Sequence, residues 1–189
     1  MNIRIIHTPL PGCFLVGLPE QRDRRGSFVK LFHEQSFREE ELETHFPETY
    51  YSTSCRGVLR GLHFQLPPRE HVKLVYCLDG LIFDAVVDLR RGSPTYGQFA
   101  TFELSGREAT MLYIPLGMAH GFYVQSDSAI VLYKVSTTYS PAHDAGILWN
   151  SAGIPWPSLS PILSARDETF PALTDFNTPF IFQQEESCS

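Results

Sequence analysis

The chain has 189 residues, of which 43% are hydrophobic and 19% are charged. This length is typical of a single domain with a substantial core, and the composition excludes a disordered or collagen-like chain. Fifteen lysines and arginines against 21 aspartates and glutamates give a formal charge of −6, which argues against general binding to nucleic acids. An anion that this protein binds must therefore meet a local cluster of arginines.

No membrane-spanning segment or cleaved secretion signal is expected. The apolar run over residues 74–89 is interrupted by Asp79, Asp84 and Asp88, and the N-terminal apolar stretch is broken by His7 and two prolines. The four cysteines are widely spaced and form no CxxC pair. We therefore predict buried free thiols in a cytoplasmic protein at Cys13, Cys55, Cys77 and Cys188.

Short runs of branched and aromatic residues alternate with turn residues along the chain. One helix is expected over residues 36–46, with Ser36 as its N-cap and Glu39 completing a capping box. Strands are expected after it over residues 58–65, 72–78, 81–89, 98–104, 110–114, 121–125 and 129–136. This pattern predicts an all-β barrel or sandwich, in one domain over residues 1–189 that becomes irregular from about residue 164.

The alternation of side chains along the strands assigns three polar residues to one interior. Lys73 shares a face with Val75, Tyr133 shares a face with Val131, and His63 lies within the run 58–65. Each residue alone has a plain structural explanation, as a surface lysine, a core tyrosine or a turn histidine. Together they suit one reaction, because an imidazole can remove a proton beside a ketone, a cation can hold the enolate oxygen, and a phenol can return a proton.

A metal site is the competing interpretation of the histidines. Residues 115–120 have the PxGxxH form of the second cupin motif, which places His120 inside a small β-barrel. The first cupin motif supplies two histidines in an HxH pattern, whereas here His63 is followed by Phe64 and Gln65. Because two histidines and a glutamine are a poor ligand set, we expect a barrel without a metal. A metal-dependent cupin oxygenase or isomerase that uses His63, His71 and His120 is the alternative.

An ordered series of motifs resembles the dTDP-4-dehydrorhamnose 3,5-epimerase family, the cupin-fold epimerases of nucleotide-linked 4-keto-6-deoxysugars. The series spans about residues 5–175 and includes Asp23-Arg24-Arg25-Gly26-Ser27-Phe28, Arg60-Gly61-Leu62-His63-Phe64-Gln65, Lys73-Leu74-Val75, Tyr133-Lys134, Tyr139-Ser140-Pro141 and Ser164-Ala165-Arg166-Asp167. The resemblance implies a cupin-type double-stranded β-helix, or jelly-roll barrel, with a few short helices, in a homodimer with an exchanged N-terminal strand. It also implies a cofactor-free isomerase of deoxysugar and polysaccharide biosynthesis that inverts C3, C5 or both.

The resemblance further implies the catalytic roles. His63 is the general base, oriented by Asp167, while Lys73 holds the enolate oxygen at C4 and Tyr133 returns a proton from the opposite face. His120 lies at the sugar end of the site. Such a carboxylate fixes the tautomer of the histidine and stabilises the imidazolium that forms.

Substrate contacts are implied on both sides of a subunit boundary. Arg60 and Arg25 resemble the diphosphate ligands of the family, because a guanidinium fork matches phosphate oxygens. In the family, Arg25 and Phe28 arrive from a neighbouring subunit. Three further residues within the motifs are expected to contact substrate: Gln65, Tyr139 and Arg166.

Departures from the family pattern cluster at the nucleotide end, where Lys30, Glu48 and Tyr50 are the expected contacts. Lys30 stands where dTDP-specific members usually have a glutamate, Glu48-Thr49-Tyr50 replaces a Gln-x-Asn pattern, and Ser151 replaces an aspartate. A cation in place of an acceptor changes the match to a base edge. A CDP- or GDP-linked sugar, or inversion at one carbon, is therefore an alternative. A non-catalytic sugar-nucleotide binding protein is another, although binding alone requires neither an acid nor a base.

Overall fold

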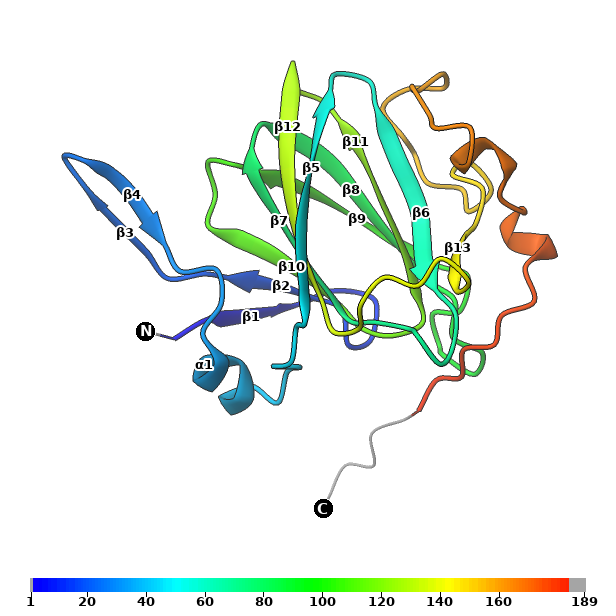
Figure 1. Cartoon of the computed structure of the whole chain (residues 1–189), viewed down its shortest axis with the longest axis horizontal. Coiled ribbons are helices and arrows are strands. Elements are labelled where there is room, and N and C mark those ends of the chain that lie inside the picture. The colour runs from blue at the N-terminus through cyan, green and yellow to red at the C-terminus, as the bar shows by residue number, and fades with distance from the viewer. Residues whose placement is uncertain (1, 184–189) are drawn as a thin grey trace.

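The computed structural model describes residues 2–183, and its two main antiparallel sheets pack face to face (Figure 1). The six-stranded sheet has the order β1 (Arg4–His7), β2 (Phe14–Gly17), β10 (Thr110–Ile114), β7 (Lys73–Asp79), β12 (Ser128–Val135) and β5 (Glu48–Cys55). The five-stranded sheet has the order β13 (Asp144–Gly146), β6 (Leu59–Gln65), β11 (Met118–Val124), β8 (Leu81–Asp88) and β9 (Phe99–Ser105). Within the described residues, no helix is long and apolar enough to cross a membrane.

The alternation along β7 divides its side chains between the interior and an outer face. Val75 and Cys77 belong to the core between the sheets, whereas Leu74 and Tyr76 pack on the other side together with Phe37. Lys73 is two residues before Val75, and its side chain is buried. The predicted shared face of Lys73, Val75 and Cys77 is therefore confirmed, and it is the interior face.

The same alternation on β6 turns His63 inward. Its neighbours Leu62 and Phe64 lie in a second apolar cluster, on the outer face of the five-stranded sheet, with Trp149 and Phe180. The irregular C-terminal segment, which contains the 3₁₀ turns η1 (Asp167–Thr169) and η2 (Leu173–Asp175), contributes to this cover. By packing against the sheet, the segment brings η1 next to β6.

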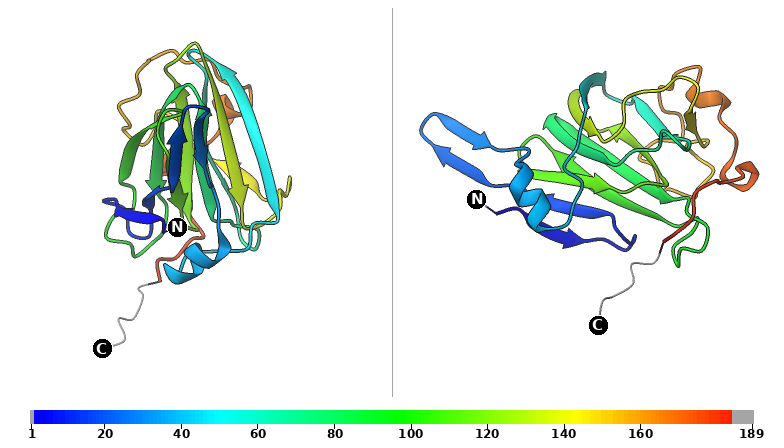
Figure 2. Two further views of the ribbon diagram at one scale, coloured as in Figure 1. Left: turned by 90° about the vertical axis from the view of Figure 1, so that its left-hand side faces the viewer. Right: turned by 60° about the horizontal axis from the view of Figure 1, so that its bottom comes forward.

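A separate hairpin leaves the two main sheets. It consists of β3 (Glu20–Asp23) and β4 (Gly26–Val29), which pair only with each other in the described part of the chain. Figure 1 and the right-hand view of Figure 2 show the hairpin projecting beyond the sheets. Phe28 on β4 is 59% exposed, so the described part of its own chain leaves most of this large apolar side chain uncovered.

Most of the predicted strands are confirmed, but the predicted helix is wrong in its bounds and its cap. Helix α1 spans Glu34–Glu39, His33 is its N-cap residue, and Ser36 lies inside it near His33 Nδ1. The helix ends early because Glu41 adopts a φ of 55°, outside the helical region. The strands β1 to β5 and β13 were not predicted.

The thiol prediction is confirmed in part. Cys13 and Cys77 are buried free thiols, but Cys55 is exposed because it ends β5, at the edge of its sheet. Cys188 lies outside the described residues.

Candidate active site

A cavity of about 410 Å³ opens between the two sheets, and most of the predicted site residues line it. His63 reaches it from β6, Lys73 from β7, His120 from β11 and Tyr133 from β12. Asp167 lies directly behind His63. Six other predicted residues also line the cavity: Glu48, Tyr50, Arg60, Gln65, Tyr139 and Arg166.

Two glycines allow the strands that carry the histidines to approach closely. A Cβ atom on Gly61 would lie 2.6 Å from the Cα atom of Gly121, and one on Gly121 would lie 2.7 Å from the carbonyl oxygen of Arg60. Gly61 also has a φ of 147°, which favours glycine. At this crossing His63 and His120 are direct partners in the register of β6 and β11. The glycines therefore place two imidazoles side by side.

His63 forms the predicted dyad with Asp167. The two residues are joined by a 2.9 Å contact between Nε2 and Oδ1, and Asp167 Oδ2 accepts the backbone N–H of Gly61. Burial alone would raise the pKa of Asp167, but the bonds from His63, Gly61 and Ser164 lower it below its ordinary value. Asp167 at Nε2 favours the tautomer with the proton on that nitrogen, in which Nε2 donates to the carboxylate and accepts nothing from Arg166 Nη2, also 2.9 Å away. Nδ1 is then left with a lone pair that can take up a proton.

Burial has the opposite effect on the imidazole. The pKa of His63 is lowered because desolvation disfavours its charged form, although Asp167 pulls in the other direction. His63 is therefore neutral near pH 7. A neutral imidazole with an orienting carboxylate is the protonation state that a general base requires.

Lys73 is a buried cation next to this base. Its side chain is 6% exposed, and its Nζ donates to the carbonyl oxygen of His63 over 2.9 Å. Burial lowers the pKa of Lys73 to about 8, while the nearby charges of Asp144 and Asp84 oppose that shift. Lys73 is therefore mostly charged at pH 7. A desolvated cation in a cavity stabilises an oxyanion far more strongly than a lysine in water does.

Tyr133 is held between two other rings. Tyr50 stacks on it with ring centroids 4.9 Å apart, and His120 approaches it edge-on at 6.2 Å. Burial raises the pKa of Tyr133 well above its ordinary value, with further contributions from the nearby Tyr50 and Asp84. The phenol therefore keeps its proton across the physiological range, as a proton donor must.

A second histidine–carboxylate pair lies deeper in the barrel. His120 Nε2 is 2.8 Å from Asp84 Oδ2, and both side chains are buried. The sequence analysis missed Asp84, although a signal was available. Asp84 alternates with the core residues Ile82 and Val86 of β8, so the strand pattern already places a carboxylate on the interior face.

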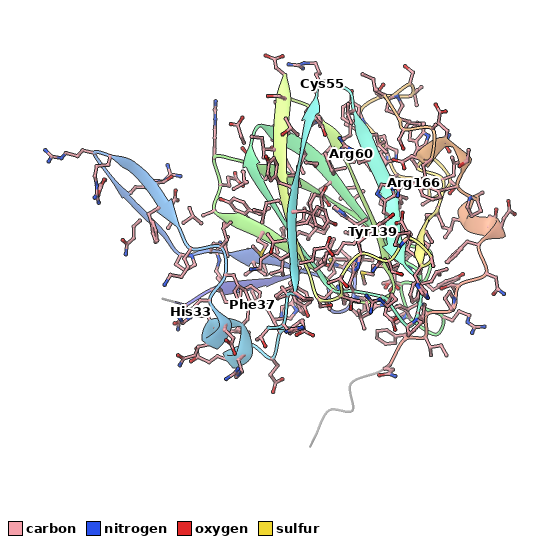
Figure 3. The ribbon with its side chains drawn as sticks, in the orientation of Figure 1. His33, Phe37, Cys55, Arg60, Tyr139 and Arg166 are labelled. Atoms are coloured by element: carbon pink, nitrogen blue, oxygen red, sulfur yellow. The ribbon has the colours of Figure 1, made fainter. Side chains whose placement is uncertain are left out.

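The cations at the cavity differ in how they are paired. Arg166 forms an ion pair with Asp144, and its Nη2 is also 2.9 Å from His63 Nε2. Arg60 donates to Ser54 Oγ over 2.9 Å, and within residues 2–183 it has no acidic partner. Figure 3 shows Arg60, Arg166 and Tyr139 in the same part of the molecule, away from α1. The guanidinium of Arg60 is therefore available to bind an anion. Asp144, the partner of Arg166, was not predicted, because no local sequence pattern pointed to it.

Three of the predicted contact residues have internal partners. Gln65 Oε1 accepts the backbone N–H of Ser140 over 2.6 Å, and its Nε2 donates to the carbonyl oxygen of Arg69 over 2.7 Å. Glu48 Oε2 accepts the backbone N–H of Tyr139 over 2.6 Å. These bonds fasten the loop that carries Tyr139 to the rim of the cavity.

Arg25, Phe28 and Lys30 do not reach the cavity of their own chain. Arg25 is on the turn of the β3–β4 hairpin, where its guanidinium pairs with Asp23, and Phe28 and Lys30 follow on the returning strand and just after it. None of the three lines the cavity. The predicted roles of these residues therefore depend on a second copy of the chain.

The donor set expected of a metal-dependent cupin is not found in the described part of the chain. Across residues 2–183, no three histidine, cysteine or carboxylate side chains converge closely enough to hold a metal ion. His63 and His120 each direct Nε2 at a carboxylate, and His71 Nδ1 faces the amide Nε2 of Gln65. In residues 2–183, His63 and His120 are thus each paired with a carboxylate.

The chain is similar to known proteins in sequence and in overall structure. The sequence profile of the family described as dTDP-4-dehydrorhamnose 3,5-epimerase matches residues 7–175. A dTDP-4-dehydrorhamnose 3,5-epimerase of Shigella flexneri is 40% identical over 87% of this chain and 93% of its own. A dTDP-4-dehydrorhamnose 3-epimerase of Streptomyces niveus is 41% identical over 79% of this chain and 74% of its own. The crystal structure of dTDP-6-deoxy-D-glucose-3,5-epimerase from Legionella pneumophila, in complex with dTDP-4-keto-L-rhamnose, is similar with a TM-score of 0.92. It is 33% identical and covers 97% of this chain and 100% of its own.

Proposed function

The chain belongs to the dTDP-4-dehydrorhamnose 3,5-epimerase family, and from this premise we propose that its cavity inverts C3 and C5 of a nucleotide-linked 4-keto-6-deoxyhexose. The observation that carries the proposal is the His63–Asp167 pair, 2.9 Å apart, beside the buried ammonium of Lys73. This arrangement places a general base, His63, beside a cation, Lys73, that can stabilise the enolate oxygen. The enzyme is one cupin-type domain that works in the cytoplasm, and the buried free thiols of Cys13 and Cys77 fit that location.

The proposed reaction moves only protons. His63 takes the proton from the carbon next to the ketone. The electron pair of that C–H bond forms a double bond to C4, and the π pair of the ketone moves to the C4 oxygen. Lys73 stabilises the resulting enolate electrostatically. Tyr133 donates a proton to the same carbon from the opposite face, so the configuration is inverted and the ketone is restored. His63 then releases its proton to solvent and the Tyr133 phenolate takes one up, which resets the site for the second carbon. Because the oxidation state does not change, the balance requires no electron carrier.

dTDP is the proposed nucleotide. The named relatives are dTDP-sugar epimerases, and the Legionella protein was solved with dTDP-4-keto-L-rhamnose. Lys30, Glu48 and Tyr50 depart from the family pattern at the nucleotide end, so the choice of base needs a test of its own. We therefore expect turnover in D₂O to be fastest with the dTDP-linked 4-keto-6-deoxyglucose, compared by NMR with the CDP- and GDP-linked sugars. Faster turnover of another nucleotide would reassign the base.

We expect Tyr133→Phe to separate proton exchange from inversion. Removal of a proton needs His63 and Lys73 but not the phenol, so solvent deuterium still enters the substrate. Inversion needs a donor on the opposite face, and we expect it to fall by about 10²-fold or more, the usual contribution of a positioned acid. NMR of the product measures both quantities, with C5 as the more sensitive position. Equal loss of exchange and inversion would contradict the role of Tyr133.

The proposed enzyme is a homodimer in which the β3–β4 hairpin of one chain completes the cavity of the other. Its support is the exposed Phe28 on a hairpin that projects from the sheets, together with the distance of Arg25 from its own cavity. Arg25 would then join Arg60 at the diphosphate. This supply of cations from two chains lets a chain of net charge −6 bind a dianion.

We expect Arg25→Ala to weaken nucleotide binding by about ten- to 100-fold, the usual effect of losing a hydrogen bond to a charged group. Arg24→Ala is the matched control from the same turn.

A stronger test mixes Arg25→Ala with His63→Ala under conditions that allow subunits to exchange. In a shared site, the mixed dimer combines an intact His63 with an intact Arg25 and regains activity. Mixed dimers that regain no activity would show that Arg25 serves the cavity of its own chain, which contradicts the exchanged hairpin.

A further inference from the structure

Tyr50, which was expected at the nucleotide end, stacks on Tyr133 in the wall of the cavity. The two rings are 4.9 Å apart with an interplanar angle of 19°. They are also direct partners in the antiparallel register of β5 and β12. Cross-strand aromatic pairs of this kind hold each other in a defined orientation.

The position of Tyr50 at the sheet edge makes it the outer cover of Tyr133. Strand β5 is the last strand of the six-stranded sheet, and Tyr50 is 42% exposed whereas Tyr133 is only 8% exposed. On another side Tyr133 meets the edge of His120, which is itself fixed by Asp84. Without Tyr50, the ring of Tyr133 would lose its one stacked neighbour.

A change in the orientation of the Tyr133 ring acts on the hydroxyl more than on any other atom, because the hydroxyl is at the far end of the side chain. Proton delivery to carbon requires the donor to lie close to the carbon and along the axis of the new bond, and small misplacements are costly. Removal of the proton by His63 does not involve this ring. The stack therefore controls the second half of the reaction and leaves the first half intact.

We propose that Tyr50 is a positioning residue that holds the phenol of Tyr133 in line with the substrate carbon and so sets how often proton removal ends in inversion. This role rests on the proposed function, in which Tyr133 is the acid. Tyr50 needs no contact with the substrate to perform it. The role requires the aromatic ring of Tyr50, which stacks on Tyr133, and does not require its hydroxyl.

The test compares Tyr50→Ala and Tyr50→Leu with Tyr50→Phe, which keeps the ring. The substrate is dTDP-4-keto-6-deoxyglucose in D₂O, and NMR gives the ratio of inversion to deuterium exchange at C3 and C5. We expect this ratio to fall roughly two- to tenfold in Tyr50→Ala and Tyr50→Leu, the range that the energy of one aromatic pair supports. Because inversion and exchange are measured on the same bound substrate, their ratio is independent of any change in KM that the loss of this cavity-lining side chain causes. Tyr50→Phe is expected to keep the wild-type ratio.

Each contrary outcome has a distinct meaning. A wild-type ratio in both Tyr50→Ala and Tyr50→Leu overturns the positioning role. An equal fall in Tyr50→Phe also overturns it, because the hydroxyl would then be the active part. Tyr133→Phe is measured in parallel. If that variant keeps the wild-type ratio, the acid assignment in the proposed function fails; if it lowers the ratio while the Tyr50 variants do not, only the present inference fails.

Discussion

His63→Ala is expected to lose deuterium exchange from solvent at both C3 and C5 of the substrate. The imidazole is the neutral base of the cavity, since burial lowers its pKa and Asp167 directs its tautomer. Removing a positioned general base costs about 10²–10⁴-fold in rate. NMR of the 4-keto sugar in D₂O measures the loss, because deuterium enters the substrate once the proton on His63 has exchanged with solvent, whether or not inversion follows.

The matched control is a second histidine that lines the same cavity. Burial and the charge of Lys73 lower the pKa of His71 to about 3, and its Nδ1 faces the amide of Gln65. Such an imidazole is neutral but has no carboxylate to stabilise an added proton, so it makes a poor base. We expect deuterium exchange in His71→Gln to stay within about tenfold of wild type, because the variant loses at most the net energy of one hydrogen bond in the cavity wall. Wild-type exchange in His63→Ala would remove His63 as the base.

Asp167→Asn separates the two functions of the dyad. The amide keeps most of the shape of the carboxylate but cannot stabilise an imidazolium, and it can present an N–H to Nε2 and so favour the wrong tautomer. We therefore expect a fall in exchange that approaches the loss in His63→Ala, with nucleotide binding unchanged. Retention of the wild-type rate would show that the 2.9 Å contact orients nothing that the reaction uses.

Local sequence patterns were sufficient for the interior strands and for the residues on them. Lys73 and Tyr133 could be assigned to the interior because strict alternation beside valines leaves a polar side chain no other face. The edge strand β5 was missed for the converse reason. Its residues Glu48–Cys55 are mostly exposed and polar, so they show neither an apolar run nor alternation. The hairpin β3–β4 has the same character.

Tertiary contacts explain the rest of the misses. The burial of Phe37 and Leu42 against the outer face of the six-stranded sheet fixes where α1 lies, so that His33 and not Ser36 occupies the N-cap position. The partnership of His63 with Asp167 spans 104 residues, and no local spacing encodes it. It was expected only through the resemblance to a family. The stack of Tyr50 on Tyr133 required the register of two strands, one of which had not been predicted.

Lys73→Gln is expected to reduce turnover by about 10²–10³-fold, the usual loss when one group that stabilises an oxyanion is removed. Glutamine can still donate a hydrogen bond but carries no charge, so the enolate loses its electrostatic partner. Because Lys73 also donates to the carbonyl oxygen of His63, folding is checked by the far-UV CD spectrum and by nucleotide binding. Turnover at the wild-type rate would show that the ammonium does not stabilise the enolate.

The pH profile of turnover provides the sharper test of Lys73. His63 must be neutral to accept a proton, and since burial lowers its pKa, activity falls only as the pH drops below the ordinary range for histidine. Lys73 must be charged, and with a pKa of about 8 it loses its proton as the pH rises through that value. The pH profile of wild-type activity should therefore be bell-shaped, with an alkaline limb near pH 8.

In Lys73→Arg the cation persists to far higher pH, so the alkaline limb should move well above pH 8 even if the rate is lower. If the limb stays near pH 8 in Lys73→Arg and in Lys73→Gln, a different group titrates there, and the enolate oxygen must be stabilised by something other than the ammonium of Lys73.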